Sequence, residues 1–187
     1  MARNARFIPF VLFLIFPGLV YSAEEPVVVT ATRTAQTVDA SLSAVSVIDR
    51  EEIEALQPLT VTDILRTVPG LTVSNTGGLG QPSSVFLRGS ESDHVLVLID
   101  GVKVGSTTLG STSFQYLDPD QIERIEVVRG PRSSLYGPDA IGGVIQIFTR
   151  DPAKAPRASA FATGGTDDYS KFGARLSAGE NATKFSL

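Results

Sequence analysis

A glycine-rich turn between two strand-like stretches constrains the fold of this chain more than any other feature. Residues 124–129 alternate charged and β-branched side chains, which is typical of a half-buried strand. Two glycine–proline pairs and the double glycine Gly142-Gly143 follow, and they predict a tight reversal because glycine adopts backbone angles that other residues avoid. Residues 144–148 are strand-like again. The stretch therefore predicts two strands joined by a compact turn.

Few side chains in the sequence are suited to catalysis or to metal binding. Cysteine is absent, which excludes disulfides and thiolate metal sites, and His94 is the only histidine. Without a Ser-His-Asp pattern we expect no catalytic residue and no metal site, and we interpret His94 as a packed side chain beside an apolar strand. The glycine-containing residues 75–84 have no G-x-G-x-x-G pattern and no following lysine, which disfavours a nucleotide site.

Composition narrows the class of protein further. A hydrophobic content of 42% is enough to build a core, so a wholly disordered chain is not expected. The formal net charge of −4 argues against nucleic acid as a partner, because binding to phosphates depends on basic residues.

The first 22 residues have the form of a secretory signal peptide. Arg3 and Arg6 make a basic start, and the apolar run over residues 7–20 is too short for a bilayer span of about 20 residues. We expect cleavage after Ser22 and export from the cytoplasm.

The following segment, residues 23–36, contains a short extended stretch. Its proline disfavours helix, and three valines followed by threonine favour an extended chain. An isolated strand of this kind has unpaired backbone groups and can add to the sheet edge of another protein. An edge strand of its own domain is the alternative. The residues of the stretch are Pro26, Val27, Val28, Val29, Thr30 and Ala31.

Capping and turn signals define the elements of the central region. Asp49 with Glu52, and Thr60 with Asp63, resemble capping pairs and predict two short helices, each stopped by a proline. Asp100-Gly101 between apolar stretches predicts a two-residue hairpin turn. Strands are expected at residues 43–48, 71–74, 95–99 and 102–104, and long polar loops at 75–84 and 105–115.

Three ordered motifs resemble the plug domain of TonB-dependent outer-membrane transporters. They are Val-Phe-Leu-Arg-Gly at residues 85–89, His-Val-Leu-Val-Leu-Ile-Asp-Gly-Val at residues 94–102, and Ile-Glu-Val-Val-Arg-Gly-Pro with the glycine-rich strand after it at residues 125–147. The resemblance covers roughly residues 25–151. It implies an α+β plug domain over residues 37–151, with a small mixed sheet and short helices.

Residues 152–187 differ in composition and residue pattern from the plug-like part. Alternating small, aromatic and polar residues suit antiparallel strands with one lipid face, and after a plug signature they resemble the first antiparallel strands of an outer-membrane β-barrel. A plugged barrel has about 22 strands, and each strand needs about 9 to 11 residues. We therefore expect a fragment or a truncated product. The strands are expected at residues 158–165, 171–179 and 183–187.

The resemblance also implies roles for residues near the N-terminus and in the turns. Residues 26–31 resemble the TonB box, the peptide that pairs with the C-terminal domain of TonB. Arg88 and Arg129 are implied to latch the plug by pairing with carboxylates on the barrel wall. Solvated turn arginines, which contribute little, are the alternative.

Within the family, residues 75–84, 94–103 and 129–137 resemble the cobalamin receptors most. This similarity implies energised uptake of cobalamin, or of another large scarce nutrient, through a protein that contacts outer-membrane lipid. Calcium is implied only for barrel loops beyond Leu187, and no other cofactor is implied. A ferric-siderophore receptor and a soluble periplasmic plug-derived module remain alternatives, with a secreted enzyme third. The implied ligand contacts are Pro82, Ser84, Glu91, Thr108 and Leu109.

Overall fold

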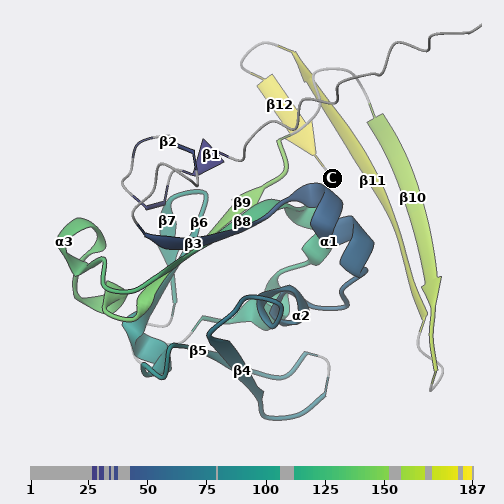
Figure 1. The fold of residues 1–187 in the computed structure, drawn as a ribbon. Helices are drawn as coiled ribbons and strands as arrows, with labels where there is room; N and C mark the ends of the chain where they lie inside the picture. The colour runs from purple at the N-terminus through teal and green to yellow at the C-terminus, as the bar shows by residue number, and fades with distance from the viewer. Residues whose placement is uncertain are drawn as a thin grey trace, which may run out of the picture.

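The centre of the molecule is a five-stranded mixed sheet (Figure 1). Its strand order is β3-β8-β9-β6-β7, with β6 and β9 parallel and the other neighbours antiparallel. The strands are β3 (Ala44–Ile48), β6 (Val95–Ile99), β7 (Val102–Val104), β8 (Ile122–Arg129) and β9 (Gly143–Thr149). With the short helices described below, this sheet confirms the predicted α+β class.

The computed structural model describes most of the chain from Val27 onward. The predicted signal peptide lies outside the described residues, as do the candidate site residues Pro26, Val29, Thr108 and Leu109. The described residues are 27–28, 30–31, 34, 36–37, 43–78, 80–105, 112–151, 157–166, 170–180 and 183–186.

The glycine-rich stretch folds as predicted, with β8 and β9 antiparallel and Arg129 opposite Gly143. The reversal contains the single helical turn α3 (Ser133–Tyr136) and the 3-10 turn η4 (Pro138–Ala140). Glycine is required at the start of β9. Gly143 has a φ of +155°, and a Cβ there would collide with the carbonyl oxygen of Val128 and the side chain of Leu87.

Both predicted helices form on one face of the sheet. Asp49 caps α1 (Arg50–Leu56) by accepting the N–H of Glu52 at 2.9 Å. Thr60 and Asp63 make the predicted reciprocal capping box at the start of α2 (Val61–Leu65). The capping signals therefore placed both helix starts correctly.

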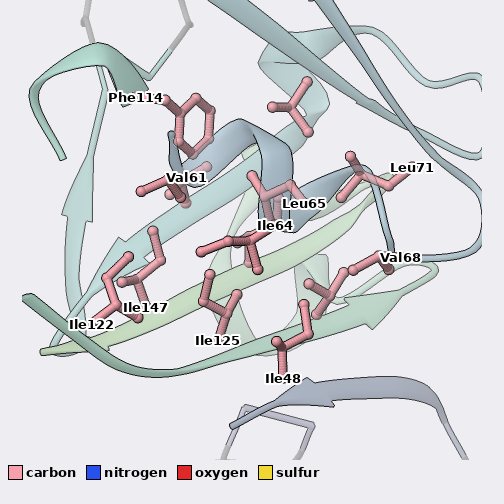
Figure 2. Packing of buried hydrophobic residues seen from close by; sticks show 14 of the residues in the cluster. Ile48, Val61, Ile64, Leu65, Val68, Leu71, Phe114, Ile122, Ile125 and Ile147 are labelled. Carbon is pink, nitrogen blue, oxygen red and sulfur yellow. The ribbon is translucent and has the colours of Figure 1, made fainter. Parts of the chain in front are cut away.

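The main core lies between α2 and the sheet. Figure 2 shows Ile64 and Leu65 of α2 directed toward Ile125 of β8 and Ile147 of β9. The antiparallel pair β4 (Leu71–Asn75) and β5 (Ser83–Leu87) forms its own two-stranded sheet and contributes Leu71, Val85 and Leu87 to the same core. The layer of α1, α2 and the β4–β5 pair thus covers one face of the sheet.

The prediction of a half-buried strand is wrong for the centre of β8. Ile125, Glu126, Val127 and Val128 are all buried, so both faces of the strand are covered there. The second face is covered by the N-terminal segment, whose Val28 and Ala31 pack with Val128. The charged residues of the strand suggested a solvated face, whereas Glu126 has no solvent exposure.

The predicted Asp-Gly hairpin turn is confirmed. Asp100 and Gly101 have φ values of +48° and +81°, as a two-residue turn of this kind requires. The Asp100 carboxylate also accepts the backbone N–H of Thr149 at 2.9 Å and its hydroxyl at 2.6 Å. The turn therefore fixes the end of β9 as well as the β6–β7 hairpin.

The last strands form a separate antiparallel sheet with the order β10-β11-β12 (Figure 1). They are β10 (Arg157–Gly164), β11 (Ser170–Glu180) and β12 (Thr183–Ser186), close to the predicted ranges. Among the described residues, no helix is long and apolar enough to cross a membrane.

Candidate functional site

Three segments that are distant in sequence meet beside the β4–β5 pair. Ser84 of β5, Ser92 of the 3-10 turn η1 (Ser92–His94) and Thr112 line one small crevice. Ser84 is a predicted ligand contact, and Ser92 follows the predicted contact Glu91. Thr112 comes directly after residues 106–111, which contain the remaining two predicted contacts. The fold therefore brings the described ends of all three predicted ligand loops to the same side.

Hydrogen bonds position these loops. Thr76 donates its backbone N–H and its hydroxyl to the carbonyl of Pro82, at 3.3 and 3.0 Å, which closes the β4–β5 loop. The hydroxyl of Thr112 donates to the carbonyl of Val104 at 3.2 Å and closes the neck of the next loop. Pro82 and Glu91 are exposed and Ser84 is half-buried, so none of these three predicted contacts is enclosed in the core.

A larger groove of about 510 Å³ lies next to these loops. It runs between α2, the β4–β5 loop, the 3-10 turn η2 (Phe114–Tyr116) and Lys171 of β11. Its walls are mostly polar or small, and the side-chain oxygen of Gln115 is buried there without a hydrogen-bond partner among the described residues. Sequence reasoning missed this groove because its walls come from four segments with no common motif.

The predicted coupling stretch lies on the opposite face of the sheet. In β8, Ile125 and Val127 face the α2 core, whereas Glu126 and Val128 face the N-terminal segment. Figure 1 accordingly shows β1 (Val27–Val28) on one side of the sheet and the β4–β5 pair on the other. The two predicted sites are therefore separated by the thickness of the sheet.

The coupling stretch is neither isolated nor unpaired in this structure. Strand β1 pairs antiparallel with β2 (Gln36–Thr37), placing Val27 opposite Thr37 and Val28 opposite Gln36. Thr30 and Ala31 are buried against the sheet. The expectation of a free strand is corrected accordingly, because apolar and polar contacts with β8 hold the segment in place.

The two predicted latch arginines gather at one edge of the fold. Arg129 donates to the carbonyls of Pro69, Ala44 and Val45 at 3.0, 3.3 and 3.3 Å. The exposed Arg88 reaches the residue after Arg129, since a Cβ built on Gly130 would be 3.8 Å from the Arg88 Nη1 atom. Within the described part of the chain, neither guanidinium has a carboxylate partner.

One ion-pair cluster joins the central fold to the last sheet. Lys171 of β11 lies 3.2 Å from an Asp118 carboxylate oxygen and 3.5 Å from an Asp120 oxygen. Asp118 also caps the 3-10 turn η3 (Pro119–Gln121) by accepting the N–H of Asp120. Lys171 therefore identifies the side of β11 that faces the central fold.

The register of β10 and β11 gives these strands two different faces. Lys171 pairs with Thr163, and the next residue, Phe172, pairs with Ala162. Because side chains alternate along a strand, Phe172 is directed away from the central fold. It is 83% exposed, and Leu176 on the same face is 54% exposed. The outward face is thus apolar, with Ala158, Ala160, Ala162, Phe172, Ala174 and Leu176 along it.

Metal ligands do not cluster in the described residues, where no group of three or more His, Cys, Asp or Glu side chains could hold an ion. His94 is half-buried next to the apolar strand β6, and its backbone carbonyl accepts the N–H of Gly142 at 2.9 Å.

The TonB-dependent Receptor Plug Domain family matches residues 37–144 of the chain. The chain is 48% identical over 153 residues to the vitamin B12 transporter BtuB of Vibrio vulnificus, covering 82% of this chain and 25% of that protein. It is 41% identical over 170 residues to the vitamin B12 transporter BtuB of Photobacterium profundum, covering 89% and 28%. The chain thus spans about a quarter of the length of the curated relatives it matches.

Solved receptors share the fold. The ferric yersiniabactin uptake receptor FyuA from Yersinia pestis matches with a TM-score of 0.60 and 26% identity, over 76% of this chain and 22% of that chain. The pyoverdine outer membrane receptor FpvA from Pseudomonas aeruginosa PAO1 matches with a TM-score of 0.70 and 21% identity, over 83% and 22%.

Proposed function

The chain belongs to the TonB-dependent receptor plug domain family, and from this premise we propose that it is the plug portion of an outer-membrane transporter for cobalamin. The observation that carries the choice of ligand is the 48% identity to a protein named as a vitamin B12 transporter. The proposal concerns the whole transporter, of which this chain supplies the plug and the first strands.

Cobalamin binds, in this proposal, at the side where the three predicted loops meet. The convergence of Ser84, Ser92 and Thr112 supports this placement. A large ligand rich in amides needs many hydrogen-bonding groups at small steric cost, and backbone groups and small polar side chains supply them. The proposed contacts are Pro82, Ser84, Glu91, Thr108 and Leu109.

Residues 26–31 act as the coupling peptide for the C-terminal domain of TonB. Addition of an extended segment to a sheet edge draws its affinity from backbone hydrogen bonds. Because this segment and the ligand loops lie on opposite faces of the sheet, ligand and TonB influence each other through the plug. Ligand can change how available the segment is only if it binds one conformation of the plug more tightly than another.

The protein is exported by residues 1–22 and resides in the outer membrane. The apolar outward face of β10 and β11 supports contact with lipid, since barrel strands alternate lipid-facing and lumen-facing residues. Arg88 and Arg129 pair with carboxylates of the barrel wall. The lack of a carboxylate partner for either guanidinium in the described part of the chain supports this role, because a guanidinium pairs well with a carboxylate.

No catalytic role and no resident cofactor are proposed for this chain. Calcium enters the proposal only as a condition that is varied in the binding test below. The second candidate function is uptake of a ferric siderophore, which is favoured by the fold shared with the yersiniabactin receptor at 26% identity. A soluble periplasmic module derived from a plug is the remaining alternative, and recovery of the protein outside the outer-membrane fraction would favour it.

Direct binding to the full-length purified receptor tests the ligand. Cobalamin, haem and a panel of ferric siderophores are compared by equilibrium titration, with and without calcium. We expect saturable binding of cobalamin alone. Tight binding of an iron chelate without saturable cobalamin binding would overturn the proposed ligand.

A further inference from the structure

The carboxylate of Glu126 is buried at the centre of the sheet and bound to the N-terminal segment. Glu126 has no solvent exposure, and one of its oxygens accepts both the backbone N–H of Thr30 at 2.9 Å and the Thr30 hydroxyl at 2.6 Å. The other oxygen accepts the Nε–H of Arg124 at 3.0 Å. Hydrogen bonds to a charged group are stronger than neutral ones, so this is a strong anchor for one residue.

Thr30 is held on its other side as well. The hydroxyl of Tyr136 donates to the Thr30 carbonyl at 2.9 Å. Around these polar contacts, Val28 and Ala31 are buried with Val128, and Val45 and Val47 lie against them. Both backbone hydrogen-bonding groups of Thr30 and its hydroxyl are therefore occupied by the plug.

We infer that Glu126, with Tyr136, is the docking site that retains residues 27–28 and 30–31 on the plug, and that its contact with Thr30 competes directly with the coupling partner. This inference rests on the proposed function of residues 26–31 as a coupling peptide. The Thr30 N–H cannot donate to Glu126 and to an added partner strand at the same time. Docking on the plug and pairing with a partner through Thr30 are thus alternatives.

The docking site sets how often the segment is available. A partner that binds only the released segment has an apparent dissociation constant equal to its intrinsic value divided by the released fraction. Weakening the Glu126 contact increases that fraction and tightens partner binding by the same factor. When the segment is released, water can reach the Glu126 carboxylate, and Arg124 remains paired with it. Release therefore does not leave Glu126 as a buried charge without a partner.

Thiol accessibility in the full-length receptor tests the docking site. This chain has no native cysteine, so Val28→Cys introduces a single thiol here, at a side chain with 0% exposure. We expect Glu126→Gln to raise the rate of maleimide labelling at that thiol about tenfold, because a charge-assisted pair of hydrogen bonds is replaced by neutral ones. Thr30→Val and Tyr136→Phe, which each remove one contact, raise it by smaller factors.

Two controls separate release of the segment from loosening of the plug. Glu123→Gln changes a half-exposed carboxylate of the same strand and should leave labelling unchanged. A thiol placed at Ile64, buried on the other face of the sheet, should not react faster in the Glu126→Gln background. Faster labelling at Val28→Cys alone supports the docking site, whereas equal acceleration at both positions overturns it.

Partner affinity supplies the second measurement. Binding of the isolated TonB C-terminal domain to the full-length receptor should tighten in Glu126→Gln by the factor seen in labelling. An unchanged labelling rate at Val28→Cys in both Glu126→Gln and Thr30→Val overturns the docking site. The proposed coupling role of residues 26–31 is then decided separately, by measuring uptake in Val28→Pro. Faster labelling without tighter TonB binding overturns the competition, and the uptake test still decides whether residues 26–31 couple transport.

Discussion

Arg129 donates a guanidinium N–H to the carbonyl of Pro69 at 3.0 Å. Pro69 follows α2, and Arg129 ends β8, so this bond ties the helical layer to the edge of the sheet. The same guanidinium reaches the carbonyls of Ala44 and Val45 in β3. A residue proposed to latch the plug to a barrel therefore also holds the plug itself together.

This dual role predicts that Arg129→Ala destabilises the plug. Loss of hydrogen bonds from a charged group should lower the free energy of unfolding by about 2 kcal/mol. This change in the free energy of unfolding is measured by urea titration of the full-length receptor, in which unfolding is detected by the reactivity of a thiol introduced at Ile64. The matched control is Arg88→Ala, whose exposed side chain has no hydrogen bond inside the described part of the plug and should cost less than about 0.5 kcal/mol. Equal effects of the two substitutions would contradict the internal role of Arg129.

Gly143→Ala should destabilise the plug strongly. A Cβ at Gly143 would collide with the Val128 carbonyl and the Leu87 side chain, and the backbone φ of +155° is unfavourable for alanine. We expect a loss of at least about 2 kcal/mol, as for other overpacked positions. Gly78→Ala is the control, because nothing lies within 4 Å of a Cβ there. The same urea titration compares them, and a change no larger than that of Gly78→Ala would refute the argument.

Elements with local signals could be predicted from the sequence. The capping box of Thr60 and Asp63 depends on residues three apart, and the Asp100-Gly101 turn on two adjacent residues. Such contacts form within one turn of chain, so composition and spacing are sufficient to predict them. The alternation in β10 and β11 likewise predicted strands, because the side-chain period is a property of the strand itself.

Features that join distant segments could not be predicted in this way. The burial of Glu126 depends on Thr30, which is 96 residues away, and nothing in the pattern of β8 distinguishes a covered carboxylate from a solvated one. The parallel pairing of β6 with β9 depends on the order of strands in the sheet. The groove beside Gln115 is formed by four segments that meet only after folding. In each case the information lies in tertiary packing.

The outward face of β10 predicts a position-specific effect of charge. Ala160 lies on that face opposite Ala174, so Ala160→Lys should place an ammonium in lipid, at a cost of up to about 2–4 kcal/mol near the bilayer centre. We expect less assembled full-length receptor in the outer membrane, measured by fractionation and heat-modifiability on gels. Ala160→Leu, which changes size without charge, should assemble normally. Equal assembly of both variants would show that this face is not exposed to lipid.

The proposed coupling role of residues 26–31 gives the sharpest functional prediction. Val28→Pro deletes a backbone N–H, fixes φ and restricts Val27, so it should prevent strand addition and abolish uptake. Val28→Ala keeps the N–H; it removes buried methyl groups from the docked segment but leaves the backbone able to pair, so uptake should persist. Binding of cobalamin should be nearly unchanged in both variants, because the segment and the ligand loops lie on opposite faces of the sheet. Uptake and surface binding are therefore measured on the same cells. Normal transport by Val28→Pro, or equal loss of binding and uptake, would mean that residues 26–31 are a structural strand of the plug and not its coupling peptide.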